Sequence, residues 1–226
     1  MKIKKTLILS SILASTLLLS ACAEADVIGK TAVTSFEALL DQLGDKVAFD
    51  EANSYWGLVS PTGETFEWSK DFSSTPDAVI TFDAAPFIEA GLTLERLPAE
   101  QYQYDEASGK LHMPFELSQD AFEYTDSDTA LDTFKQIVKT NRESIGYHAD
   151  LDHYGISLGN GNMFEWAKDM GKNDKDIVFV LNPQPFIDAG ANLSKVEGWS
   201  FAKVKTTDHQ GKMVEVDKLL KPFELN

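Results

Sequence analysis

The chain contains 226 residues, of which 36 are acidic and 20 are lysine or arginine, so its formal net charge is −16. A surface of this charge repels phosphate backbones, so we expect no nucleic-acid partner, whereas a cationic peptide, a basic protein or a small-molecule ligand stays open. The single cysteine excludes an internal disulfide, and the chain is long enough to build a packed core without one.

The N-terminal segment has the pattern of an export signal. Three lysines precede an uncharged apolar stretch over residues 7–19, which is short for a membrane span. The stretch ends in Leu-Leu-Ser-Ala-Cys at residues 18–22, and this motif closely resembles the lipobox of bacterial lipoproteins. The resemblance implies a signal peptide over residues 1–21, acylation of Cys22 as an anchor in membrane lipid, and a tether over residues 22–32.

The lipoprotein resemblance also implies a location in the bacterial cell envelope. By the sorting rule of such proteins, Ala23 after the cysteine implies the outer membrane in a host with two membranes. In a host with one membrane, the same leader implies the outer face of the plasma membrane. Cleavage removes three lysines and no acidic residue, so the net charge falls from −16 to −19. The alternative is an ordinary signal peptide in which Cys22 is incidental.

The rest of the sequence repeats itself once. Residues 57–71 share two glycines and the run Phe-Glu-Trp-x-Lys-Asp with residues 155–169, which lie 98 positions later. Residues 86–91 share Pro-Phe-Ile-x-Ala-Gly with residues 185–190, which lie 99 positions later. Chance does not order so many matches collinearly, so the pattern predicts a tandem duplication.

The predicted duplication divides the chain into two similar units. We place unit 1 at residues 33–117, an acidic linker at residues 118–128 and unit 2 at residues 129–226. Each unit is predicted to follow the order α-β-β-β-α-β-β. Strands joined by hairpins favour an α+β fold with mainly antiparallel sheet over alternating parallel units. The units are long enough to be two domains or two halves of one domain.

Each unit is predicted to begin with an amphipathic helix. In unit 1, Thr34 and Glu37 form a candidate capping box at the start of this helix. The apolar stripes have helical spacing and consist of Phe36, Leu39, Leu40 and Leu43 in unit 1 and of Leu131, Phe134, Ile137 and Val138 in unit 2.

A hairpin follows each predicted helix. In unit 1, large apolar side chains occupy every second position on both sides of a Pro-Thr-Gly turn at residues 61–63. They are Trp56 and Leu58 before the turn and Phe66 and Trp68 after it. In unit 2, an Asn-Gly turn at residues 160–161 separates similar strands, which is a strong hairpin signal.

A buried strand then leads into a short helix in each unit. We expect these strands at residues 78–82 and 177–181. The expected N-caps and C-terminal stops of the short helices are Asp83 with Gly91 and Asn182 with Gly190. Two strands complete each unit, at residues 101–105 and 110–115 in unit 1 and at residues 201–205 and 212–216 in unit 2.

The repeated Phe-Glu-Trp-x-Lys-Asp segment is the first candidate ligand site. On a strand, its aromatic side chains point to one face and its glutamate to the other. If the indoles stack on a sugar or a cationic ligand and the acids supply polar contacts, the ligand-binding residues are Trp68, Glu67 and Asp71 in unit 1 and Trp166, Glu165 and Asp169 in unit 2. The alternative, which we favour, makes the tryptophans core anchors and leaves the acids in solvent.

A second candidate is a cluster of metal-capable side chains, which consists of His148, Asp150, Asp152 and His153. The cluster precedes a predicted strand, and residues five apart in a strand or a helix do not share a face. We therefore favour a solvated acidic loop, and we expect neither a metal nor a cofactor.

The sequence shows no catalytic motif among those for which the spacing is diagnostic. We therefore expect a non-enzymatic, lipid-anchored envelope protein that binds a ligand or a protein partner through the cleft or sheet surface between its units. Two alternatives stay open. One is an envelope carbohydrate-active hydrolase that uses unassigned carboxylates, and the other is an acidic structural or inhibitory protein with a basic partner.

Overall fold

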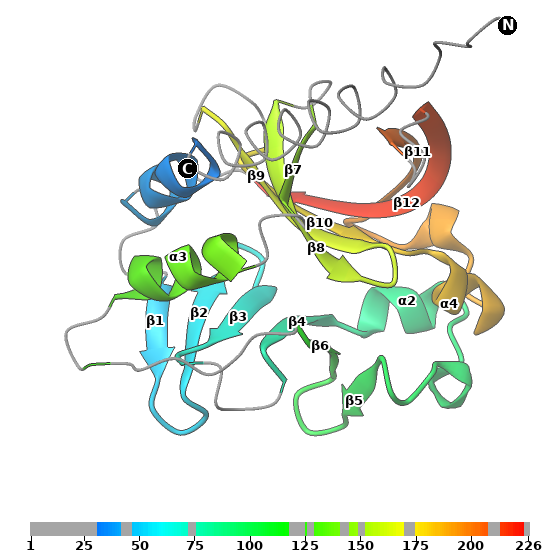
Figure 1. The fold of residues 1–226 in the computed structure, drawn as a ribbon. Coiled ribbons are helices and arrows are strands. Elements are labelled where there is room, and N and C mark those ends of the chain that lie inside the picture. Colours follow the sequence, from blue (N-terminus) through cyan, green and yellow to red (C-terminus); the bar gives the residue numbers. More distant parts are fainter. Residues whose placement is uncertain are drawn as a thin grey trace, which may run out of the picture.

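The computed structural model describes residues 31–41, 47–71, 76–117, 125, 129–140, 145–148, 152–169, 175–207 and 213–223. These residues form two six-stranded sheets with short helices, and every strand pairing is antiparallel (Figure 1). The prediction of a mixed helix and strand fold with antiparallel sheet is therefore confirmed. Cys22, the signal peptide and almost all of the linker lie outside the described residues.

The two sheets have the same strand order, and each belongs to one half of the chain, which we call the first half (residues 31–117) and the second half (residues 129–223). The first sheet has the order β1-β2-β3-β4-β6-β5, with β1 Val47–Asp50, β2 Tyr55–Val59, β3 Thr65–Ser69, β4 Ala78–Asp83, β5 Gln103–Asp105 and β6 Lys110–Phe115. The second has the order β7-β8-β9-β10-β12-β11, with β7 Ile145–His148, β8 His153–Gly159, β9 Asn162–Ala167, β10 Ile177–Leu181, β11 Ser200–Thr207 and β12 Met213–Phe223.

One strand of each sheet was not predicted. β1 and β7 follow the first helix of each half and form the edge of their sheet beside β2 and β8. Both strands have only four residues, which is too short for a clear alternation of apolar and polar side chains. Each half therefore contains one more strand than the predicted order.

The helices are short, and none of the three predicted N-caps, Thr34, Asp83 and Asn182, occupies the N-cap position. The described helices are a helix over residues 31–41, α2 Ala85–Glu89, α3 Ala130–Thr140 and α4 Gln184–Asp188, with 3-10 turns η2 Leu94–Arg96 and η4 Leu193–Lys195. The first helix already includes residue 31, inside the expected tether, so Thr34 lies within the helix and cannot cap it. No helix within the described part of the chain is long and apolar enough to cross a membrane.

Asp83 does not cap α2, because it is the last residue of β4 and its carboxylate lies 3.8 Å from Lys110 on the paired strand. The N-cap positions are Ala84 in α2 and Pro183 in α4, and neither offers a side-chain hydrogen bond. The predicted C-terminal stops are confirmed. Gly91 and Gly190 follow the two helices with φ angles of +101° and +100°, a left-handed conformation that favours glycine.

The two sheets share one hydrophobic core, because their aromatic faces meet. Three pairs of phenylalanines from matching positions of the sequence repeat are in contact across the centre, with ring centroids 3.5, 4.2 and 4.8 Å apart: Phe36–Phe134 and Phe66–Phe164, which are stacked, and Phe87–Phe186, which is tilted. The first pair joins the helix over residues 31–41 to α3, and the third joins α2 to α4, which lie side by side in Figure 1.

Backbone contacts between the halves are also reciprocal. The N–H of Thr93 donates to the carbonyl of Ala189 at 3.0 Å, and the N–H of Asn192, at the matching position, donates to the carbonyl of Ala90 at 2.8 Å. A second reciprocal pair lies at the other end of the core. The hydroxyl of Ser35 donates to the backbone carbonyl of Lys168, and the hydroxyl of Thr133, at the matching position, donates to the backbone carbonyl of Lys70. Each patch on one half thus contacts the same patch on the other, which is the pattern of a two-fold interface.

Candidate functional site

Trp68 and Trp166 lie in the shared core and have no exposed surface. Both indoles make edge contacts with Phe36, at centroid distances of 6.0 and 5.5 Å. A ligand at the surface has no access to either ring, so the structure does not support them as stacking platforms. Their burial follows from strand alternation, which turns every second side chain of β3 and β9 toward the facing sheet.

The acidic residues of the same segment lie away from the tryptophans. Glu67 and Glu165 point to the outer faces of the two sheets, whereas Asp71 and Asp169 follow the ends of β3 and β9. The six predicted ligand-binding residues therefore do not form one site. Of these six residues, Glu165 belongs to a buried group of titratable side chains.

This group is a buried cluster of Glu165, His148 and His153, which we call the His–Glu–His cluster. The Nδ1 atom of His148 lies 3.0 Å from Oε1 of Glu165, and the Nδ1 atom of His153 lies 3.7 Å from Oε2. Glu165 and His153 are each only 1% exposed. The expectation that these histidines cannot share a face was wrong, because the chain reverses between β7 and β8 and pairs His148 directly with His153.

The two aspartates of the predicted metal cluster do not join the His–Glu–His cluster. Asp152 lies in the turn with a φ of +54°, and its carboxylate accepts a hydrogen bond from the hydroxyl of Tyr147. Asp150 lies outside the described residues. Within the described ranges, no group of three His, Cys, Asp or Glu side chains is placed to hold a metal ion. The two imidazoles instead face different oxygens of one carboxylate.

The histidines keep the buried carboxylate ionised. Burial alone raises the pKa of Glu165, but the contacts with His148 and His153 outweigh it, so the pKa lies below its usual value. Gly155 provides the space for this side chain, because it lies opposite Glu165 in the β8–β9 ladder. A Cβ atom at Gly155 would lie 3.1 Å from Cγ of Glu165 and 2.9 Å from Cε of Met163.

The first half has a different set of side chains at the matching positions. Asp50 and Tyr55 replace the two histidines, while Gly57 still faces Glu67 across the ladder. Burial and the charge of Asp50 raise the pKa of Glu67, so the fold destabilises its ionised form. The ionised form of Glu165, by contrast, is stabilised. Both glutamate sites had a signal in the sequence, because each glutamate is repeated together with the glycine that it faces, Gly57 with Glu67 and Gly155 with Glu165.

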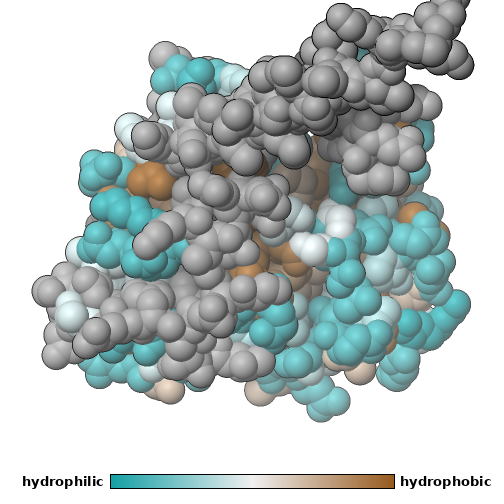
Figure 2. Space-filling view, in the orientation of Figure 1, coloured by the Kyte–Doolittle hydropathy of each residue, from teal (hydrophilic) through white to brown (hydrophobic). Residues whose placement is uncertain are grey.

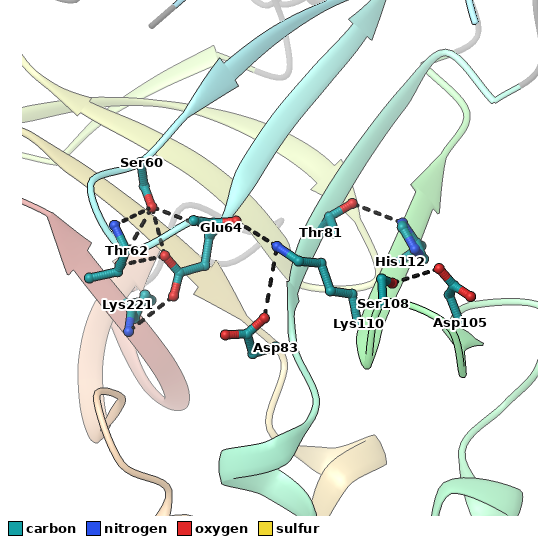
Figure 3. Close-up of polar contacts among 11 residues, drawn as sticks. Ser60, Thr62, Glu64, Thr81, Asp83, Asp105, Ser108, Lys110, His112 and Lys221 are labelled. Carbon is teal, nitrogen blue, oxygen red and sulfur yellow. Dashed lines mark hydrogen bonds and ion pairs between the residues drawn. The ribbon is translucent and has the colours of Figure 1, made fainter.

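A second feature arises where the hairpin turn of each half meets the opposite half. The β2–β3 turn of the first half forms a filled contact, which we call the closed junction. Oε1 of Glu64 lies 3.1 Å from Nζ of Lys221, and Ser60 and Thr62 donate their hydroxyls to Oε2 at 2.6 and 2.5 Å (Figure 3). Trp199 packs beside this contact against Phe82, with the ring centroids 5.3 Å apart.

The closed junction holds its carboxylate in ionised form. Burial raises the pKa of Glu64, but the hydrogen bonds from Ser60, Thr62 and Lys221 lower it below its usual value. Glu64 and Lys221 are both largely buried, and their opposite charges meet across the boundary between the halves. A paired and hydrogen-bonded carboxylate of this kind is a structural contact with no free group for a ligand.

The β8–β9 turn of the second half meets the first half at what we call the open junction. Asn162 and Met113 stand at the positions that match Glu64 and Lys221, so the ion pair is absent, and Tyr102 stands at the position that matches Trp199. A groove of about 400 Å³ lies at this junction. Besides two prolines, its lining consists of Arg96 and Gln101 from the first half and Asn160, Asn182, Gln184 and Asp188 from the second half.

The second-half wall of the groove is held by its own hydrogen bonds. Nδ2 of Asn182 donates to the carbonyl of Asn160 at 3.0 Å, and Nε2 of Gln184 donates to Oδ1 of Asp188 at 2.8 Å. Arg96 faces this wall from the end of η2, and it has no ion pair within the part of the chain that the structure describes. Figure 2 shows that the surface over α2, α4 and β5 is mainly hydrophilic. Sequence reasoning missed the groove.

Comparison with known proteins identifies no relative of the chain. No protein-family model, curated protein or solved structure shows significant similarity to the chain. The function is therefore inferred from the groove, the leader sequence and the relation between the halves.

Proposed function

We propose that the chain is a lipid-anchored, non-enzymatic protein of the bacterial cell envelope that binds a small polar ligand in the open junction. The groove carries this proposal, because a pocket lined by both halves and by preorganised polar groups has the form of a small-molecule site. The lipobox-like sequence at Cys22 supports the anchor, which attaches the protein to the outer membrane, or to the plasma membrane in a host with one membrane.

The proposal includes a tandem duplication as the origin of the groove. Support comes from the repeat in sequence, the shared strand order and the reciprocal contacts of matching phenylalanines. A two-fold arrangement of identical units would have two identical junctions. Substitution then filled one junction with the pair of Glu64 and Lys221 and left the other open for a ligand.

Binding is tested by a thermal-shift screen of the purified protein against amino acids, sugars, nucleosides, cationic peptides and divalent metals. A ligand at a hundred times its dissociation constant adds about 2.7 kcal/mol to the free energy of unfolding, which such a scan detects. A substitution of Asn182 or Gln184 to alanine should reduce the shift. If no small molecule shifts the melting temperature, the binding proposal fails and a protein partner becomes the next hypothesis.

The anchor is tested separately by growth of cells with a fatty acid that carries an alkyne label. We expect the wild-type protein to be labelled and to sediment with membranes. Cys22→Ser should lose the label and leave the protein in the unprocessed or soluble fraction. An unlabelled wild-type protein would remove the anchor from the proposal and leave the groove untouched.

A further inference from the structure

We propose that the ligand of the open junction is a small zwitterion, an amino acid or a short peptide, with its carboxylate on Arg96 and its ammonium group on Asp188. This inference depends on the proposed binding function and specifies its ligand class. It follows from the two charged side chains of the groove, which come from opposite halves of the molecule.

Arg96 is the carboxylate-binding group. It is one of only two arginines in the chain, its side chain is exposed, and no described acidic group pairs with it. The guanidinium offers two parallel N–H donors that match the two oxygens of a carboxylate. An arginine with no ion pair among the described residues has its guanidinium available to a ligand.

Asp188 is the ammonium-binding group. Gln184 donates to its Oδ1 atom at 2.8 Å, which fixes the orientation of the carboxylate and leaves Oδ2 as an acceptor. Gln101, Asn160 and Asn182 complete the lining with amide and carbonyl groups, which suit the polar remainder of an amino acid or the peptide bond of a dipeptide.

Charge and size favour a zwitterion over the other small molecules. The strongly negative chain repels a free anion, whereas a zwitterion has no net charge and still presents a carboxylate to Arg96. The groove has no aromatic side chain in its lining, so it has no platform on which a sugar ring would stack. Its volume of about 400 Å³ lies at the lower end of the range for small-molecule sites, which is about 300–1,000 Å³.

The test is isothermal titration of the purified full-length protein with mixed free amino acids and dipeptides, followed by two matched sets of analogues. N-acetyl amino acids lack the ammonium group, and amino-acid amides lack the carboxylate. We expect free amino acids or dipeptides to bind at least about tenfold more tightly than either analogue set, because each set leaves one charged side chain without its partner.

Four variants connect this preference to the two side chains. Arg96→Gln should weaken binding of the zwitterion at least about tenfold and abolish its preference over the amides. Asp188→Asn should weaken binding by a similar factor and abolish the preference over the N-acetyl compounds. Lys195→Gln and Glu89→Gln are the controls, because they make comparable charge changes at the matching positions beside the closed junction. Both controls should bind like the wild type.

The outcomes separate the ligand class from the proposed function. Equal binding of zwitterions and analogues, or binding unaffected by Arg96→Gln and Asp188→Asn, would overturn the zwitterion and leave the binding function in place. The same holds if a sugar or nucleoside binds and the amino acids do not. If no small molecule binds the wild type, both proposals fail.

Discussion

The closed and open junctions lie at matching places in the two halves, yet they have opposite character. The closed junction has a carboxylate that is paired with Lys221 and covered by two hydroxyl groups, and an indole fills the space beside it. The open junction has Asn162 and Met113 in place of the ion pair and Tyr102 in place of the indole, and a groove remains. The comparison indicates that one buried ion pair distinguishes a structural contact between the halves from a space for a ligand.

The outer faces of the sheets repeat this lesson with charge. Glu67 and Glu165 occupy matching positions opposite a matching glycine, but only Glu165 is flanked by two histidines. The pKa of Glu165 is lowered and that of Glu67 is raised, although burial acts in the same direction on both. The neighbours therefore decide the protonation behaviour, and the shared backbone does not.

Removal of one partner of the buried ion pair should have the largest effect on stability. Glu64→Ala leaves Lys221 buried without a counter-charge, so we expect a loss of about 3 kcal/mol in the free energy of unfolding. The double substitution Glu64→Asn with Lys221→Met copies the open junction and should recover most of this loss. Urea denaturation of the two variants measures the difference, and an equal loss in both would show that the unpaired charge of Lys221 is not the cause of the loss.

The two glutamates of the outer faces should respond differently to removal of their charge. Glu165→Gln removes the stabilised carboxylate between the histidines, so we expect a loss of about 2 kcal/mol at pH 7. Because the pKa of Glu165 is lowered in the fold, its contribution is present above the pKa of the unfolded chain and is lost as the pH falls through the folded pKa. Urea titrations between pH 7 and pH 3.5 should therefore fall less steeply for Glu165→Gln than for the wild type.

Addition of a methyl group at the glycine that faces each glutamate should change the free energy of unfolding by a smaller amount, and the change should differ between the two halves. Gly155→Ala places Cβ within 3.1 Å of Cγ of Glu165, whereas the closest atom to a Cβ at Gly57 is Cγ of Glu67 at 3.6 Å. We expect Gly155→Ala to cost about 1 kcal/mol and Gly57→Ala to be close to neutral. Thermal unfolding of both variants measures this, and equal melting temperatures would show that the second half adapts to the added methyl group.

The smallest effect is expected at Glu67, and it has the opposite sign. The raised pKa of Glu67 means that its ionised form is unfavourable in the fold, so Glu67→Gln should gain about 0.5 kcal/mol at pH 7. The gain should disappear as the pH falls below the pKa of the unfolded chain, where the wild-type side chain is protonated in both states. A loss of stability at pH 7 would show that the carboxylate makes a favourable contact instead.

Local patterns predicted the elements of this fold and failed at their boundaries. Alternation correctly placed Phe66 and Trp68 on the buried face of a strand, and the repeated glycines correctly ended α2 and α4. Thr34 and Asp83 have the side chains of good N-caps, but the helix includes residues before Thr34 and the carboxylate of Asp83 lies beside Lys110. Tertiary contacts overrode the capping preference in the second case.

The candidate site was less accessible to sequence reasoning than the fold. The His–Glu–His cluster requires the reversal between β7 and β8, which no turn signal between His148 and His153 indicated. The open groove joins Arg96 to Asn160, which are 64 positions apart, and its existence depends on how the two halves pack. A pattern within one half does not contain this information.

The phenylalanine pairs across the core have a consequence for biosynthesis. Phe36, Phe66 and Phe87 leave the ribosome well before their partners Phe134, Phe164 and Phe186, so the first half has no second face against which to bury them. We therefore expect the first half to complete its hydrophobic core only after the second half has been synthesised.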